Sequence, residues 1–175
     1  ASNRAYITFL NRLRADSFDS LLASVSRKDG SLTPTEMQAI ANYINVATGR
    51  GDLGKAAAAA ETLATVFFSP RLVASRFQLL AGQPMYRGSF RTRQAIAQEY
   101  GKFLAGIGVV LGLGIMAGAT VERDPRNSDF GKLKFGNTRL DVLGGLGQVS
   151  TLVGRLATGE TVNASGEVKP IRGEV

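Results

Sequence analysis

The sequence contains neither cysteine nor histidine among its 175 residues. Without cysteine, the chain cannot form disulfides, thiolate metal sites or a thiol nucleophile. Without histidine, it lacks the commonest metal ligand and the usual general base at neutral pH. An enzyme would have to work with carboxylates, lysine or tyrosine, and no two acidic residues are placed persuasively at one site. We therefore expect no enzymatic activity, no cofactor and no small-molecule substrate.

The best candidates for metal ligands are three aspartates in the second half of the chain, Asp124, Asp129 and Asp141. Their spacing matches no defined coordination geometry. Aspartates that flank a turn or a hairpin more often accept hydrogen bonds that cap and close the loop. We expect that role for these three residues, and no metal site.

The chain is basic, with a formal net charge of +7 and a pI near 10.1. Such a balance suits nucleic acid, an anionic membrane surface or an acidic protein partner, and an ordinary soluble domain can carry the same excess. The hydrophobic content of 44% is that of a folded protein. Because Arg12 and Arg14 interrupt the first apolar run, we expect no secretion signal. Because the first residue is not Met and the end is polar, we expect the chain to be a piece of a longer polypeptide.

Two helices are predicted before residue 48. Tyr6, Phe9, Leu10 and Leu13 share one stripe of an amphipathic helix that residues 27–31 terminate. The next helix has the clearest start in the chain, because in TPTE (33–36) a threonine can cap, a proline takes the first helical position and a glutamate completes a capping box. Gly49 supplies its end.

Gly49, Gly51 and Gly54 spell G-x-G-x-x-G. A dinucleotide site needs a strand before these glycines, and here a helix precedes them, so we interpret the segment as a linker between helices. A closely packed helix is expected over 53–68, where five alanines are followed by Val66, Phe67 and Phe68. Ser69 and Pro70 then cap and begin a further helix, which stops at Gly82.

The longest apolar segment is FLAGIGVVLGLGIMAGATV, residues 103–121, which has no charge and five glycines: Gly106, Gly108, Gly112, Gly114 and Gly118. It continues without a breaker from residue 89, which predicts one helix over 89–120. As a helix, its nineteen residues measure about 28 Å, close to the thickness of the hydrocarbon layer of a membrane. Two interpretations stay open: a core helix whose glycines make room for neighbouring helices, and a helix that inserts into a membrane.

After this helix the period of the apolar residues changes. Two short alternating runs around Gly136-Asn137 predict a β-hairpin over 132–142, with positive φ at the glycine. A glycine-rich helix that ends at Gly159 and a tail over 161–175 that is extended or loosely paired follow. The expected fold is mostly α, a helical module with a long glycine-rich apolar helix and one short C-terminal hairpin. We divide it into N-terminal helices (1–48), a helical module (49–160) and the tail.

Several motifs together resemble a segment of the very large internal virion proteins of tailed phages. They are TGRG (48–51), FFSPRLVASRFQLL (67–80), DPRNSDFGKLKFGNTRLDVLGGLGQ (124–148) and RLATGE (155–160). The resemblance covers about residues 49–160. It implies a module of a protein that is packaged with the genome, located in the virion interior, and ejected into the host cell envelope. The partners it implies are other virion proteins (portal or ejection proteins), further copies of the chain, packaged double-stranded DNA and, after ejection, the host membrane.

The residues leave the role of the chain open. In one hypothesis, the helix at 103–121 inserts into the host membrane during genome delivery, and its five glycines pack against other helices. In another, the chain is a basic module that binds DNA without reading its sequence, through a group of arginines that contact phosphates: Arg71, Arg76, Arg87, Arg91 and Arg93. A third is an integral membrane protein unrelated to phages.

Overall fold

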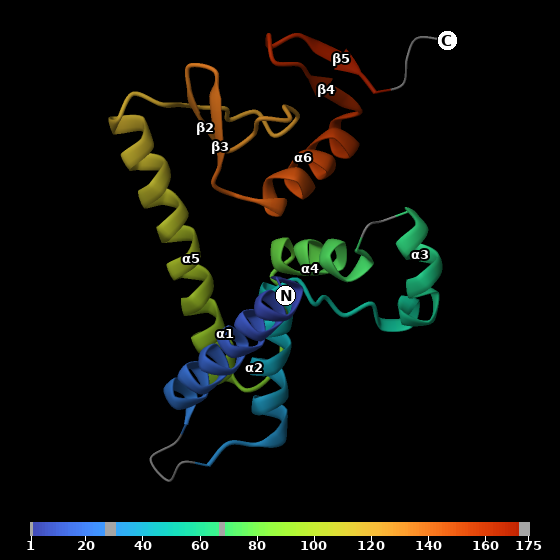
Figure 1. Cartoon of the computed structure of the whole chain (residues 1–175), viewed down its shortest axis with the longest axis vertical. Helices are drawn as coiled ribbons and strands as arrows, with labels where there is room; N and C mark the ends of the chain where they lie inside the picture. Colours follow the sequence, from blue (N-terminus) through green and yellow to red (C-terminus); the bar gives the residue numbers. More distant parts are fainter. Residues whose placement is uncertain (1, 27–30, 67–68, 172–175) are drawn as a thin grey trace. The chain divides into compact units, whose positions relative to one another are not determined.

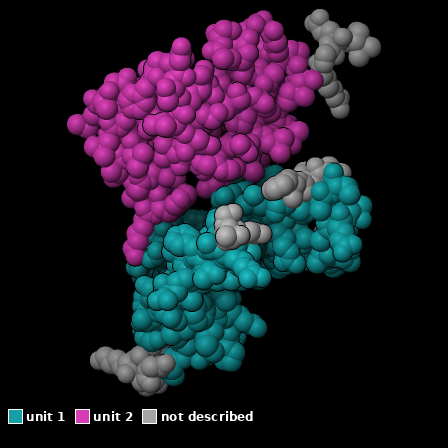
Figure 2. All heavy atoms as spheres, viewed as in Figure 1, with its two compact units in different colours: residues 1–100 teal, residues 101–175 magenta. Residues whose placement is uncertain are grey.

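The computed structural model of the chain describes residues 2–26, 31–66 and 69–171. The chain forms two compact units, residues 1–100 (unit 1) and 101–175 (unit 2) (Figure 2). The elements of unit 1 are helical (Figure 1): α1 (Ser2–Val25), α2 (Pro34–Ala47), η1 (Gly54–Ala59), α3 (Ala60–Val66), α4 (Pro70–Leu80), η2 (Gln83–Tyr86) and the first part of α5 (Phe90–Met116). Unit 2 holds the rest of α5 and five short strands around one helix: β1 (Thr120–Val121), β2 (Lys132–Phe135), β3 (Thr138–Asp141), α6 (Gly145–Thr158), β4 (Glu160–Val162) and β5 (Val168–Pro170).

The predicted fold class is confirmed, since most elements are α-helices and the strands lie near the C-terminus. Residue 48, where we expect a boundary, lies inside unit 1, and Arg14 of α1 donates from Nε to Oγ1 of Thr48 at 2.8 Å. The division into three modules stays a prediction about the sequence.

The start of α2 is the predicted capping box. The backbone N–H of Glu36 donates to Oγ1 of Thr33, and the N–H of Thr33 donates to Oε2 of Glu36 at 2.9 Å. Glu36 is 2% exposed, and its Oε1 accepts from Oγ of Ser89 at 2.7 Å. The same carboxylate therefore caps α2 and holds the residue just before α5.

Unit 1 is built around one cluster of aliphatic side chains, Leu21, Val25, Ile40, Ile44 and Ile96, which α1, α2 and α5 contribute. Tyr43 and Tyr100 pack at its edge with ring centroids 5.9 Å apart. The N-terminal half of the predicted apolar stripe of α1 lies outside this core, because Tyr6 and Phe9 are 62% and 64% exposed. Only the C-terminal half of α1 is buried by the unit.

The segment that follows α2 is a linker between helices, as predicted, and its second glycine allows a close approach. A Cβ on Gly51 would lie 2.3 Å from the backbone nitrogen of Ser75, and the Gly51 N–H donates to the carbonyl of Arg71 at 3.0 Å. Of the helix expected over 53–68, the α-helical part is α3, and residues 54–59 form the 3₁₀ helix η1. The expected close packing is wrong, because the side chains of residues 57–59 are exposed. Phe67 and Phe68 lie outside the described residues. The predicted Ser69 cap of α4 is present.

Helix α5 begins where we expect it and ends at Met116, four residues before the predicted end. Gly118 has a φ of 92°, which turns the chain, and Thr120 and Val121 then pair as β1 with Lys134 and Leu133 of β2. The predicted end at residue 120 is therefore wrong, because pairing with a distant strand prevails over a locally uninterrupted apolar run.

The predicted hairpin is confirmed, with Leu133 opposite Leu140, Lys134 opposite Arg139, and Gly136 at a φ of 54°. With β1 it forms an antiparallel sheet in the order β1-β2-β3, which lies near the C-terminal end of α5 (Figure 1). Gly159 ends α6 with a φ of 71°. The tail, expected to be extended or loosely paired, forms within residues 160–170 the antiparallel pair β4–β5.

Candidate functional site

The apolar segment of α5 is exposed. Phe103, Leu104, Val109, Leu113 and Met116 are 49% to 85% exposed, and only 6% of the most apolar stretch of the helix is buried. The interpretation of this segment as a core helix is therefore wrong for the single chain. Large exposed apolar surfaces in proteins mark contacts with a membrane or another protein.

The five glycines do three different things. A Cβ on Gly106, Gly108 or Gly112 would meet no heavy atom within 4 Å, so these glycines make no close contact within the described chain. Gly114 does pack: a Cβ there would lie 2.4 Å from Cδ2 of Leu133, in the sheet. Gly118 forms the turn after the helix. Packing of the first three against other chains stays a prediction.

The arginines that we expect to contact DNA lie on α4 (Arg71, Arg76), after η2 (Arg87) and on the first turn of α5 (Arg91, Arg93). Arg87 is engaged, because its Nη1 donates to Asn42 and its Nη2 lies 3.9 Å from a carboxylate oxygen of Asp52. Arg76 is half-buried. The exposed side chains of Arg71, Arg91 and Arg93 have no hydrogen-bond or ion-pair partner among the described residues.

Beyond α5, the loop of residues 122–131 is organised by Asn127, which is 2% exposed. Its Nδ2 donates to the carbonyl of Asn163 at 3.1 Å and to Oε2 of Glu122, and its Oδ1 accepts from the N–H of Asp129 at 2.9 Å. Its own carbonyl accepts from Oγ1 of Thr151 in α6. Asn127 therefore ties the loop to α6 and to the segment after β4.

An ion-pair group lies beside Asn127. The guanidinium of Arg126 donates to both carboxylate oxygens of Asp124 and to Glu160. These hydrogen bonds from Arg126 lower the pKa of Asp124 from 3.8 to about 2, and the pairing with Asp124 raises the pKa of Arg126. Asp124 also accepts from the N–H of Arg126, and Asp141 from the N–H of Gly144, which confirms the predicted loop-closing role for these two aspartates.

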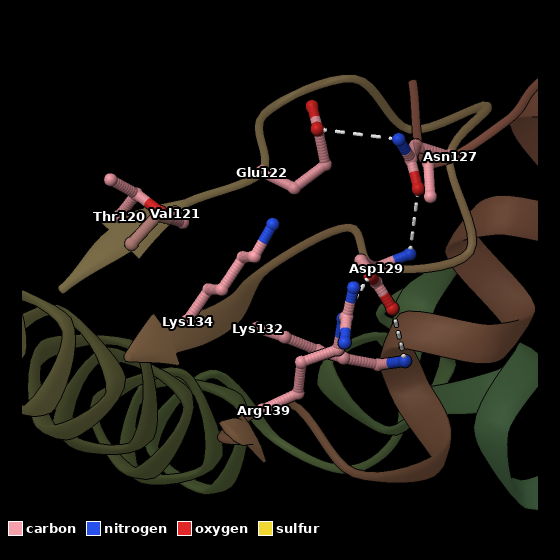
Figure 3. A pocket seen from close by; sticks show the side chains of 9 residues that line it. Thr120, Val121, Glu122, Asn127, Asp129, Lys132, Lys134 and Arg139 are labelled. Carbon is pink, nitrogen blue, oxygen red and sulfur yellow. Dashed lines mark hydrogen bonds and ion pairs between the residues drawn. The ribbon is translucent and has the colours of Figure 1, made fainter. Parts of the chain in front are cut away.

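The charged face of the β1–β2–β3 sheet lines a hollow of about 190 Å³ (Figure 3). Its cations are Lys132, Lys134 and Arg139, and its acids are Glu122 and Asp129. Asp129 holds two of the cations, accepting from Nζ of Lys132 at 3.0 Å and from Nε of Arg139. The hydrogen bond from Lys132 is the main cause that lowers the pKa of Asp129. The described residues contain no cluster of three acids that suits a metal ion.

Sequence reasoning missed this hollow. The alternation of charged and apolar residues in KLKF (132–135) places two lysines on one face of a strand, but the loop that walls the hollow is held by Asn127 through distant partners. Comparisons with protein-family models, with curated proteins and with solved structures found no match. The resemblance to phage internal virion proteins therefore rests on the motifs of the sequence.

Proposed function

We propose that this chain is a membrane-inserting module of a tailed-phage virion protein, which is packaged in the particle and takes part in genome delivery through the host envelope. The observation that carries the proposal is the exposure of α5, because its charge-free apolar part, residues 103–116, is mostly uncovered by the described residues of the single chain. The resemblance of the flanking motifs to internal virion proteins supports the phage context.

The length of the exposed helix makes the proposal specific. Its charge-free helical part, residues 103–116, measures about 21 Å, which is less than the roughly 30 Å of a typical hydrocarbon layer. A helix that is too short is accommodated by a thinner bilayer, by flanking charges that extend to the interface, or by association of several helices. Lys102, the residue directly before this part, is placed for the second of these.

Insertion is tested with the full chain, which has no native cysteine, so that one introduced cysteine can carry an environment-sensitive dye. With the Leu113→Cys variant labelled, we expect a blue shift of the dye's emission on adding vesicles, larger with short acyl chains than with long ones. The control is Ser165→Cys, in the exposed turn between β4 and β5, whose dye should not shift. No shift at position 113 with any vesicle would remove the membrane part of the proposal.

The phage context has an independent test. Mass spectrometry of purified particles should find peptides of this chain, and the intact mass of the protein that contains them should exceed that of 175 residues. A protein that is present in infected cells and missing from the particles would remove the virion part of the proposal, whatever the vesicle experiment shows.

A second candidate function, binding of packaged DNA, is favoured by the exposed arginines of unit 1 whose side chains have no partner among the described residues. Duplex DNA affinity should fall steeply with salt, because each cation–phosphate contact releases counterions. Replacing Arg71, Arg91 and Arg93 by alanine should reduce the salt slope by about 0.9 for each contact that is lost. Replacing Arg12, which pairs with Asp16 on the surface of α1, is the matched control. Affinity without salt dependence would exclude this function.

A further inference from the structure

A repulsive charge pair lies across the sheet that follows α5. Lys134 of β2 is directly opposite Arg139 of β3, and like charges at such positions destabilise a hairpin. No carboxylate neutralises Lys134, whose amine has no hydrogen-bond or ion-pair partner among the described residues and extends over the hollow in Figure 3. A bound anion between these two side chains would remove the repulsion.

The other groups of the hollow are arranged to leave cationic donors available. Asp129 takes up only Nε of Arg139, so the two terminal amino groups of that guanidinium stay without a partner among the described residues. Glu122 is occupied elsewhere, since its Oε1 accepts from the N–H groups of Arg123 and Asp124 at 2.9 Å each and its Oε2 from Asn127. The guanidinium fork and a lysine amine are the donors that proteins use to bind phosphate.

The size of the hollow suits such a group. Its volume of about 190 Å³ exceeds several-fold the roughly 30 Å³ that one water molecule takes up in the liquid. It is therefore large enough for a tetrahedral phosphate, and its walls of strand and tied-down loop hold the donors in place.

The position of the hollow indicates where the phosphate comes from. Thr120 and Val121, the last residues of the charge-free segment, line it, and Gly114 of α5 packs on Leu133 of the same sheet. The hollow therefore stands at the end of the helix that we assign to the membrane, at the level where lipid headgroups begin. We propose that it binds the phosphate of an anionic phospholipid and fixes the depth at which α5 inserts, an inference that rests on the proposed function.

The test uses the full chain with the dye at Leu113→Cys and vesicles of one acyl composition. Phosphatidylcholine vesicles that contain phosphatidic acid are compared with vesicles that contain oleate at the same zeta potential, an anionic lipid without phosphate. We expect tighter binding to the phosphatidic acid vesicles. The Lys134→Ala/Arg139→Ala variant should lose about tenfold in that affinity, the loss typical of a charge-assisted contact, and little toward oleate vesicles.

The matched control is the Arg123→Ala/Lys169→Ala variant, which removes the same charge from exposed positions of unit 2 outside the hollow. It should weaken binding to both anionic vesicles equally. A circular dichroism spectrum identical to that of the parent chain verifies that each variant folds.

The outcomes separate the inference from the proposed function. Insertion that is equal with phosphatidic acid and oleate, and equal for both double variants, overturns the phosphate site and leaves the membrane helix standing. No insertion into any vesicle removes the proposed function, and binding of inorganic phosphate in solution would then overturn the lipid assignment. Loss of duplex DNA affinity in the Lys134→Ala/Arg139→Ala variant, with vesicle binding unchanged, overturns the phospholipid assignment in favour of DNA phosphate.

Discussion

Apolar packing organises the helices of unit 1, whereas hydrogen bonds organise the loop of residues 122–131 in unit 2. In unit 1, Ile40 and Ile96 are fully buried in one aliphatic cluster that three helices share. In unit 2, the best-connected buried residue is Asn127, and its hydrogen bonds hold a loop that has little regular structure. Apolar contacts are insensitive to direction, whereas hydrogen bonds have narrow geometry. The loop of residues 122–131 in unit 2 therefore depends on single polar atoms for its shape.

The largest effect is expected from a cavity in unit 1. Ile40→Ala removes a fully buried side chain, which typically costs about 2–5 kcal/mol of the free energy of unfolding. Tyrosine fluorescence during urea unfolding follows this unit alone, because the four tyrosines lie at positions 6, 43, 86 and 100.

Met37→Ala, on the same helix but 38% exposed, is the matched control and should cost much less. Hydrogen exchange of peptides from residues 120–162 should not change in either variant. If Ile40→Ala raised the exchange of these peptides as much as that of peptides from unit 1, the division into units that differ in their means of stabilisation would be contradicted.

The next effect is expected from the polar centre of unit 2. Asn127→Ala leaves the partly buried partners of three side-chain hydrogen bonds unsatisfied, which should cost about 2–3 kcal/mol. A fluorescent label on Ser165→Cys reports the unfolding of this unit. Asn137→Ala, the same change in the exposed hairpin turn, is the control. If both variants unfold at the same urea concentration, Asn127 does not organise the loop.

The features that sequence predicted are those that neighbouring residues determine. The Thr33–Glu36 box, the Ser69 cap and the Gly136 turn each need only four or five consecutive residues. The polar centre around Asn127 depends on partners 24 and 36 residues away, and no local sequence pattern predicts such contacts.

The errors have the same origin. The five alanines at 56–60 favour a helix in isolation, but nothing in the sequence shows that the side chains of residues 57–59 are exposed. The premature end of α5 is set by a two-residue strand whose partner lies in the hairpin. The hollow depends on both local and distant residues. The alternation in residues 132–135 predicts its two lysines on one face of a strand, whereas its walls depend on contacts between residues far apart in the sequence.

A smaller effect should distinguish two glycines of α5. Gly108→Ala introduces a Cβ into open space and should stabilise the helix by about 0.5–1 kcal/mol, because alanine has the higher helix propensity. Gly114→Ala should instead destabilise unit 2 by about 1–2 kcal/mol, since its Cβ collides with the buried Leu133. Opposite shifts of the unfolding midpoint, followed with the label at residue 165, are the expected result. Stabilisation by both would show that the helix does not rest on the sheet.

The two units should also differ in alkaline solution. Burial raises the pKa of Tyr100 in unit 1 from 10.0 to about 12. The folded unit therefore keeps a proton that the unfolded chain has lost, so its stability is intact below pH 10 and falls as the pH rises toward 12. Tyr100→Phe should flatten the dependence of the urea midpoint over this range. A midpoint that falls as steeply in the variant would assign the loss to other groups.

In acid, unit 2 is expected to lose stability. The hydrogen bonds from Arg126 lower the pKa of Asp124 from 3.8 to about 2, so folded unit 2 binds fewer protons than its unfolded chain between these values. Its stability is then complete above pH 3.8 and declines as the pH falls toward 2. Asp124→Asn keeps an oxygen for the N–H of Arg126 and removes the charge, so its urea midpoint should be lower above pH 3.8. Below pH 3.8 the midpoint should decline less steeply than in the parent, because only Asp129, whose pKa is also lowered, still contributes. A midpoint of unit 2 that declines equally in parent and variant would show that the Arg126 pair does not set this acid response.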